Sequence, residues 1–389
     1  MRCLDYPPAS PSHHFGGHVR HLTSPLAPRR PASRTGRVDI AIIASSRHPI
    51  REPFAGGLEA HTHSLAVRLR EGGHRVTVYA SGDSDPALGV VPVCPAPSRL
   101  DLSEAARSDP SMLADRFVHD HHAYLSLMLG LRELDYDIVH NNSLHYLPIA
   151  MADALRAPLV TTLHTPPTPW IESAVTCAGG RVPFASVSQA TAVAWEHATT
   201  VDRVILNGVD LARWPFVARP RGDYAVWTGR LVPEKGPHLA LEAASAAGLP
   251  LKLAGPCPDP DYFEREIAPR LDGHEYAGHL SHCELAELVG NARVALFSPC
   301  WEEPYGLVVA EALACGTPVA AFDRGAPREI LDSGSGRLVP AGDVAALARA
   351  ATEAIGDIDR RSCRARAESH CSHEAMVGAY VEFYEAVAA

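Results

Sequence analysis

Short apolar runs alternate with amphipathic stretches along most of the chain. The runs at 38–44 and 75–80 are rich in branched aliphatic residues, which is typical of strands buried on both faces of a sheet. Between them Leu58, Leu65 and Leu69 recur at helical spacing. Regular alternation of strand and helix predicts parallel sheets joined by right-handed crossovers.

The alternation occurs twice, on either side of a segment at 207–222 that is rich in turn residues. We predict an α/β protein with two Rossmann-like, doubly wound parallel-sheet domains at 37–206 and 223–372, and a C-terminal helix at 373–389. Strands are expected at 38–44, 75–80, 137–140, 158–163, 184–187, 203–206, 224–229, 250–255, 274–277, 293–298, 317–322 and 336–339. Further helices are expected within 110–134, with a possible break near Asp120, 144–156, 189–199, 237–247, 260–271, 282–291, 305–315, 326–332 and 343–356.

Composition narrows the class of protein. The 389 residues are too many for one ordinary domain, and 46% hydrophobic with 21% charged residues is typical of a globular protein. No apolar run approaches the ~20 residues of a membrane span, so we expect no stable membrane insertion. The net charge of −10 argues against nucleic acid as the main partner. Nine cysteines without CxxC pairs predict a reduced, cytoplasmic protein.

Residues 1–36 differ from the rest of the chain. They hold six prolines, five arginines and four histidines with one acid, Asp5, and show no hydrophobic periodicity. The segment lacks the apolar core of a secretory signal. We predict a disordered leader, or a start site placed too early, and leave open whether the mature protein contains it.

Two glutamates, Glu303 and Glu311, lie eight positions apart around the start of the helix predicted at 305–315. At ~1.5 Å rise per residue, eight helical positions span roughly 12 Å, about the distance from the hexose to the ribose of a sugar nucleotide. The first amides of the helix would seat a diphosphate, namely those near Gly306, Leu307 and Val308. A surface helix with two solvated acids is the alternative interpretation.

Two cations follow the strand expected at 224–229. Arg230 and Lys235 lie in the loop RLVPEKG, at the carboxyl end of a strand, where open α/β sheets bind ligands. The chain has only two lysines, Lys235 and Lys252. Fixed cations there would stabilise the negative charge that develops on a diphosphate leaving group. Alone, such a loop would also fit a solvated turn.

Other candidate groups are less specific. Gly56 and Gly57 precede the first helix, where glycine lets the backbone approach a phosphate, but the absence of GxGxxG disfavours a nicotinamide site. The histidine clusters at 61–63 and 119–122 lack the i, i+4 spacing of helical metal ligands. We therefore predict neither a metal site nor a cofactor. His164 differs, because it ends a predicted strand and would face the ligand crevice.

Taken in order, these motifs resemble those of the retaining glycosyltransferases of family 4. The resemblance covers roughly 38–389 and rests mainly on GRLVPEKG at 229–236 and EPYGLVVAEALACGTPV at 303–319. Weaker matches are AGGLEAHTHSLAVRLREGGHRVTVYA at 55–80, TLHTPP at 162–167, SVSQ at 186–189 and ILNGVD at 205–210. The resemblance implies the GT-B fold, in which two Rossmann-like domains face a central cleft and the last helix crosses back onto the first domain.

The resemblance also implies roles. The donor would be a nucleotide-diphosphate sugar, with a UDP-sugar favoured, and the acceptor a soluble small molecule or glycan. Arg230 and Lys235 would stabilise the leaving phosphate, Glu303 would hold the sugar hydroxyls and Glu311 the ribose hydroxyls. The remaining assignments are Gly56, Gly57 and the 306–308 amides to the phosphates, Gly278 and Leu280 to the base, His164 to the donor sugar, and His145, more weakly, to the acceptor.

One departure from the family pattern and two rival functions remain. The family often has glycine after the first glutamate, whereas this chain has Pro304, which suits a first helical turn but lacks an N–H. No carboxylate pair with the roughly 5 Å spacing of covalent retaining catalysis is marked, so front-face substitution is favoured. A sugar-nucleotide epimerase or hydrolase on the same fold, and an inactive sugar-nucleotide-binding protein, are the alternatives; a phosphorylase is disfavoured because neither lysine is placed for pyridoxal phosphate.

Overall fold

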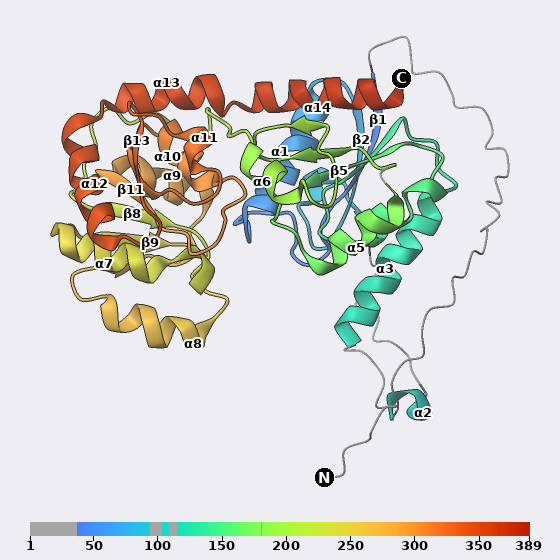
Figure 1. Ribbon diagram of the computed structural model, residues 1–389, viewed down its shortest axis with the longest axis horizontal. Helices are drawn as coiled ribbons and strands as arrows, with labels where there is room; N and C mark the ends of the chain where they lie inside the picture. The colour runs from blue at the N-terminus through green and yellow to red at the C-terminus, as the bar shows by residue number, and fades with distance from the viewer. Residues whose placement is uncertain (1–36, 94–102, 109–114, 180) are drawn as a thin grey trace, which may run out of the picture. The chain divides into compact units, whose positions relative to one another are not determined.

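Two parallel β-sheets with helices between their strands organise the chain (Figure 1). The computed structural model describes residues 37–93, 103–108, 115–179 and 181–389, which belong to one compact unit. The leader expected at 1–36 lies outside the described residues. Both sheets are doubly wound, so the two-sheet α/β class expected from the strand and helix alternation is confirmed.

The first sheet has the strand order β3-β2-β1-β4-β5-β6-β7, and its pairings are parallel. Its chain order reverses between β1 and β4, which makes that boundary the topological switch point. The strands are β1 (Asp39–Ile43), β2 (Arg75–Ala80), β3 (Val91–Pro92), β4 (Ile138–Asn141), β5 (Leu159–Leu163), β6 (Phe184–Ser186) and β7 (Arg203–Val204).

The second sheet has the order β10-β9-β8-β11-β12-β13, also parallel, and it reverses between β8 and β11. Its strands are β8 (Ala225–Thr228), β9 (Leu251–Ala254), β10 (Glu275–Tyr276), β11 (Val294–Phe297), β12 (Val319–Phe322) and β13 (Gly336–Val339). Each of the twelve strands expected from the sequence has a counterpart, whereas the short β3 was not expected.

Helices connect the strands. In the first half they are α1 (Gly57–Glu71), α2 (Glu104–Arg107), α3 (Asp115–Leu131), α4 (Leu147–Ala150), α5 (Pro169–Ala178) and α6 (Gln189–Trp195). In the second half they are α7 (Pro237–Ala247), α8 (Pro260–Tyr262), α9 (His282–Asn291), α10 (Leu307–Ala314), α11 (Pro327–Ile330), α12 (Val344–Asp357), α13 (Arg360–His370) and α14 (His373–Ala388). Short 3-10 turns lie at Pro86–Leu88, Ala152–Ala154, Pro233–Lys235 and Ala268–Arg270, and a π-helical turn at Phe263–Ile267.

The helices define two of the expectations more closely and correct a third. Helix α3 runs through Asp120 without the break that was considered possible. Within 144–156 the helical parts, expected there, are the short α4 and a 3-10 turn. Helix α10 begins at Leu307, not Tyr305, because Gly306 has a φ of +93° that a right-handed helix excludes. Pro304 therefore lies before the first helical turn rather than in it.

The strands of the first sheet alternate between two cores. Ile40 and Ile42 of β1 join the core beneath α1, whereas Ala41 and Ile43 face the core formed with α3, α4 and α5. This period-two alternation is that of a sheet covered on both faces. The second sheet is likewise enclosed, with the apolar faces of α7, α10 and α12 in its core.

Helix α14 supplies part of the first sheet's core, although it is the last element of the chain. Met376, Tyr380, Phe383 and Tyr384 are buried with residues of β1, β2 and α1. The buried tyrosine hydroxyls are satisfied, since Tyr384 bonds His140 Nδ1 at 2.7 Å and Tyr380 bonds Thr162 Oγ1 at 3.1 Å. Buried polar groups that have hydrogen-bond partners specify the position of a helix and do not destabilise the core.

Candidate functional site

A cleft of about 380 Å³ opens at the carboxyl ends of the strands that flank both switch points. Residues after β1, such as Ser45, line it, as do Leu144 after β4, Arg230 after β8 and Glu303 after β11. The carboxyl ends of strands at a switch point leave the crevice where doubly wound sheets bind ligands, and the volume is that of a small-molecule site.

Two helix N-termini meet in this cleft. Gly57 begins α1 and Leu307 begins α10, and both residues line the cleft. A Cβ atom at Gly57 would lie 3.0 Å from Leu307 Cδ1, so glycine permits the close approach of the two segments. The amides of a first helical turn have no partner within the helix, and the helix dipole adds positive potential. Two such ends form a strong site for an anion.

Lys235 and Glu303 form an ion pair in the wall of the cleft. Lys235 Nζ donates to Glu303 Oε1 at 2.9 Å and to Oε2 at 2.7 Å. Trp301 contacts both partners: its Nε1 donates to Glu303 Oε2 at 2.8 Å, and its ring centroid lies 4.7 Å from Lys235 Nζ. Glu303 is 7% exposed, so this charge is buried but fully compensated. Sequence spacing predicted both residues and not their contact.

Glu311 lies on α10 and lines the same cleft without a hydrogen-bond partner for its carboxylate among the described residues. Desolvation raises the pKa of Glu311 to about 7. A carboxylate left unpaired in a cleft is free to accept hydrogen bonds from a ligand. The premise that a single helix spaces Glu303 and Glu311 was wrong, however, because Glu303 lies before Gly306 and pairs with Gly325 in an isolated β-bridge.

Arg230 and Glu59 both line the cleft, and the positive charge of Arg230 acts on the carboxyl group of Glu59. Arg230 has one loose ion pair, 3.8 Å from Glu234, and its side chain is 41% exposed. Burial raises the pKa of Glu59, while the positive charges of Arg230 and Arg47 act in the opposite direction. Glu59 belongs to the motif AGGLEAHTH, yet its place in the cleft wall was missed; an acid in the first turn of a helix that follows two glycines was the available signal.

His164 lines the cleft at the end of β5, as expected from the strand that precedes it. Its Nε2 bonds Asn142 Oδ1 at 2.7 Å, and because that oxygen only accepts, Nε2 carries the proton and Nδ1 remains an acceptor. Burial, with His61 and His140 nearby, holds the pKa of His164 well below its ordinary value. His164 is therefore a neutral imidazole.

The cleft includes most of the residues that the sequence singled out. Gly56, Gly57, His164, Arg230, Lys235, Leu280, Glu303, Gly306, Leu307, Val308 and Glu311 line it. Gly278 and His145 do not. Gly278 has a φ of +83° and accepts a hydrogen bond from the Gly255 amide, so its part is in the backbone that shapes the loop.

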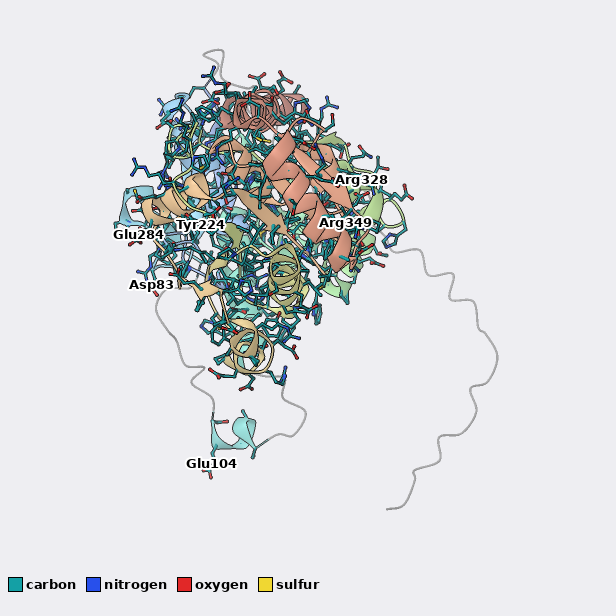
Figure 2. All side chains as sticks on the ribbon, turned by 90° about the vertical axis from the view of Figure 1, so that its left-hand side faces the viewer. Asp83, Glu104, Tyr224, Glu284, Arg328 and Arg349 are labelled. Atoms are coloured by element: carbon teal, nitrogen blue, oxygen red, sulfur yellow. The ribbon has the colours of Figure 1, made fainter. Side chains whose placement is uncertain are left out.

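Leu280 has a second environment. It also lines a shallow surface depression with Tyr224 and Glu284, both of which are labelled in Figure 2. The carbonyl of Pro304 accepts hydrogen bonds from Ser188 Oγ at 2.6 Å and Thr191 Oγ1 at 3.2 Å. Pro304 thus ties the segment before α10 to α6 of the first half, a role that its missing N–H does not affect.

Within the described ranges, no three His, Cys, Asp or Glu side chains are grouped so that they could hold a metal ion. Among the helices of that same part of the chain, none has both the length and the apolar character needed to cross a bilayer.

Comparison with known proteins agrees with this geometry. The model for "Glycosyl transferases group 1" matches residues 211–370, and that for "Glycosyltransferase Family 4" matches residues 55–213. A glycogen synthase of Mycobacterium tuberculosis is 30% identical over 362 residues, covering 80% of this chain and 85% of that protein. A phosphatidyl-myo-inositol mannosyltransferase of Mycolicibacterium smegmatis is 28% identical over 373 residues, 85% and 90% of the two chains.

Solved structures with the same fold include AviGT4, a glycosyltransferase involved in avilamycin A biosynthesis, with a TM-score of 0.68 at 24% identity over 90% of this chain and 98% of that one. Anabaena HepE in complex with UDP-glucose has a TM-score of 0.68 at 20% identity over 90% and 100%. The two facing parallel sheets and their shared cleft are those of a GT-B glycosyltransferase. The chain belongs to the group 1 glycosyltransferases of family 4, and the family predicted from its motifs is confirmed.

Proposed function

We propose that this glycosyltransferase moves a hexose-type sugar from a nucleoside diphosphate, with retention of configuration, to a hydroxyl of a soluble acceptor in the cytoplasm. The observation that carries the proposal is the meeting of two helix N-termini at Gly57 and Leu307, beside Lys235 and Arg230. Two helix dipoles and two fixed cations favour a multiply charged anion such as a diphosphate.

The donor is oriented along α10. The diphosphate lies against the amides of Gly306, Leu307 and Val308, and Glu311 accepts hydrogen bonds from the ribose hydroxyls. The unpaired carboxylate of Glu311 supports this orientation, because two hydroxyl donors would compensate its desolvation. Leu280 lies beside the base. Glu303 then faces the sugar, since it lies before the same helix.

Donor binding would break the ion pair between Lys235 and Glu303. Lys235 and Glu303 neutralise each other in the ligand-free protein. An arriving diphosphate competes for the ammonium of Lys235, and Glu303 becomes available to accept hydrogen bonds from the sugar hydroxyls. Trp301 Nε1 keeps one carboxylate oxygen of Glu303 in place while this exchange occurs.

We infer a front-face substitution for the chemical step. The bond between the anomeric carbon and the diphosphate oxygen breaks, and the acceptor oxygen bonds to the same face of that carbon. The proton of the acceptor hydroxyl passes to the departing phosphate oxygen. Arg230 and Lys235 stabilise the charge that develops on the phosphate, so the reaction requires no metal ion. Neutral His164, with Nδ1 as an acceptor, orients a hydroxyl near the sugar.

Donor and acceptor follow from different evidence. HepE was solved with UDP-glucose, and we propose a UDP-sugar as the donor here. The relatives' names point to different acceptors, a glucan in one case and a phosphatidylinositol lipid in another. We propose a soluble acceptor, because helix α1 balances Arg68 and Arg70 with Glu59 and Glu71 instead of presenting a basic face to a membrane.

A two-stage experiment tests the proposal. Thermal unfolding with UDP-, GDP- and dTDP-sugars ranks the donors, because a donor at about 100 times its Kd adds about 2.7 kcal/mol of stability. Release of the nucleoside diphosphate is then measured with and without acceptors, in buffer with excess EDTA. Acceptor-dependent release with a product of retained configuration is expected. Acceptor-independent release would indicate an epimerase or hydrolase, binding without release an inactive protein, and loss of transfer in EDTA that Mg²⁺ or Mn²⁺ restores a metal-dependent enzyme.

A further inference from the structure

Four aromatic rings form a surface cluster outside the donor cleft. They are Phe117 and His121 of α3, Tyr146 at the start of α4, and Trp170 in the first turn of α5; we call them the aromatic platform. Trp170 is 54% exposed, the highest value among the large hydrophobic side chains of the described residues. None of the four lines the cleft.

The rings of the platform lie close together and nearly parallel. Trp170 stacks on Tyr146 with centroids 5.3 Å apart at 26°, and lies 5.2 Å from Phe117 at 35°. His121 completes the group, 6.0 Å from Tyr146 and 6.3 Å from Phe117. A hydrogen bond of 2.6 Å between His121 Nδ1 and Tyr146 OH fixes two of the rings. The platform is therefore held rigidly by three separate elements.

Core packing does not account for the exposed ring of Trp170. Helix α5 is anchored by a different set of side chains, Ile171, Ala174, Val175 and Ala178, which are buried in the core beneath the first sheet. Trp170 is 54% exposed, although Tyr146 and Phe117 both contact its ring. Leaving so large an apolar surface in water is unfavourable, and exposed apolar patches of this kind mark binding sites.

A stack of rings connects the platform, through the buried Tyr124, to the loop that lines the donor cleft. Tyr146 stacks on His145 at 4.8 Å, and His145 stacks on Tyr124 at 4.1 Å and 10°. The hydroxyl of Tyr124 accepts a hydrogen bond from the Ser46 amide and donates to the Ala44 carbonyl, in the loop after β1 that lines the cleft. On the other side, the loop from His164 and Thr165, both in the cleft wall, leads directly to Trp170.

We propose that the aromatic platform binds the acceptor, and that this acceptor is a chain of neutral pyranose rings rather than a single small ring. The C–H face of a pyranose is apolar, and its hydrogens are attracted to the negative face of an aromatic ring. One end of the chain reaches the cleft beside Leu144 and Thr165 while another of its sugars lies on Trp170. The acceptor class rests on the proposed function; the binding site does not.

The polar groups of the platform fit a neutral glycan better than an anionic surface. His121 and Tyr146 contribute one imidazole and one phenol group, both of which can form hydrogen bonds with sugar hydroxyls. Glu172, two residues beyond Trp170, adds negative charge and pairs with His197 at 3.2 Å. A membrane of anionic lipids would require basic residues here.

Direct binding tests the platform without any need for turnover. The indole N–H resonances of the full-length protein are followed by NMR during titration with maltoheptaose, cellohexaose and methyl α-D-glucopyranoside, and the Trp170 resonance is identified by its loss in Trp170→Phe. We expect one of the two oligosaccharides to shift that resonance saturably, with at least about tenfold higher affinity than the monosaccharide. Trp170→Ala lacks this resonance, so its affinity is measured by calorimetry, and we expect it to be roughly tenfold weaker, the upper range for one aromatic stack.

Controls separate the possible outcomes. Leu338→Ala removes an exposed apolar side chain from β13 of the other sheet and should leave oligosaccharide binding unchanged. The affinity for the nucleotide-sugar donor should be the same in Trp170→Ala as in the unaltered protein, because Trp170 does not line the cleft. An unshifted Trp170 resonance with all three sugars would overturn the platform even if transfer to another acceptor occurs. If only phosphatidylinositol vesicles shift the Trp170 resonance, the ligand of the platform is a lipid and the glycan proposal is wrong. If the protein binds the oligosaccharide but turns over no donor, the platform is confirmed as a binding site and the proposed function is wrong.

Discussion

The ammonium of Lys235 donates to both carboxylate oxygens of Glu303, at 2.9 Å and 2.7 Å. In the proposed donor complex, the diphosphate takes the place of Glu303 beside Lys235, and the sugar hydroxyls donate to Glu303 in place of Lys235. The pair keeps two buried charges compensated until substrate arrives, at the cost of a competition on binding. Loss of one partner leaves the other uncompensated, so single substitutions at this pair reveal different roles.

Lys235→Ala and Arg230→Ala should each lower turnover by at least about a hundredfold, the scale of losing a preorganised group that stabilises transition-state charge. The measurement is release of nucleoside diphosphate with acceptor present. Lys252→Ala is the matched control, since Lys252 is the other lysine of the chain and pairs with Glu275 on the far strands of the second sheet. Near-normal transfer by one of the cleft variants would exclude the substituted residue from leaving-group stabilisation.

Glu303→Ala and Glu311→Ala should separate catalysis from binding. The ribose is held equally in the ground and transition states, so Glu311→Ala should chiefly weaken the affinity for UDP. Contacts to the sugar change as its anomeric carbon gains positive charge, so Glu303→Ala should chiefly lower kcat. Calorimetric UDP titration and donor-saturated rates decide. If Glu311→Ala binds UDP normally and Glu303→Ala loses only UDP affinity, the donor is oriented the other way.

The affinity for UDP should depend on pH through Glu311. Burial raises the pKa of Glu311 to about 7, above its ordinary value of 4.5. Ribose hydroxyls donate to the ionised form, so UDP binding lowers this pKa and releases a proton. Affinity should then fall by up to about tenfold per pH unit below 7, the limit for one linked proton. Since UDP itself titrates, Glu311→Gln gives the baseline; an identical pH profile in both proteins would exclude the linkage.

Trp301 should act as a positioning residue for Glu303. Trp301→Phe keeps a ring beneath Lys235 but removes the N–H that bonds Glu303, and Trp301→Leu removes both contacts. Hydrogen bonds to charged groups contribute about 1.5–3 kcal/mol, so Trp301→Phe should lower kcat by roughly tenfold or more, with UDP affinity nearly unchanged. Trp301→Leu should be slower still. A Trp301→Phe enzyme with the rate of the unaltered protein would confine the role of Trp301 to its ring.

The strands could be predicted because buried parallel strands are short apolar runs. The helix α13 could not, because its sequence is polar and arginine-rich. It is held instead by hydrogen bonds to backbone carbonyls: Arg360 reaches those of Val217 and Ala292, and Arg364 that of Trp214. Such hydrogen bonds join segments that are distant in the chain, and they cannot be predicted from hydrophobic periodicity.

The candidate site, like the fold, could be predicted from the sequence only in part. Motifs indicated Lys235 and Glu303 separately, because each lies at a recognisable strand end or helix start. Their ion pair joins residues 68 positions apart and depends on the packing of two loops. Trp301 belongs to no recognisable motif. The start of α10 was predicted too early because the left-handed backbone conformation of Gly306 cannot be read from the sequence alone.

The burial of α14 against the first sheet has a consequence for biosynthesis. Ile40, Ile42 and Leu65 are made first, yet Tyr380 and Tyr384, which complete their core, are made last. Until residues near 384 leave the ribosome, that face of the first sheet has only α1 against it, and the part of the core that α14 completes stays open. Synthesis proceeds at about 5–20 residues per second, so the apolar face is open for tens of seconds and is exposed to aggregation. The first half of the chain should therefore depend on chaperones during translation, although it emerges first.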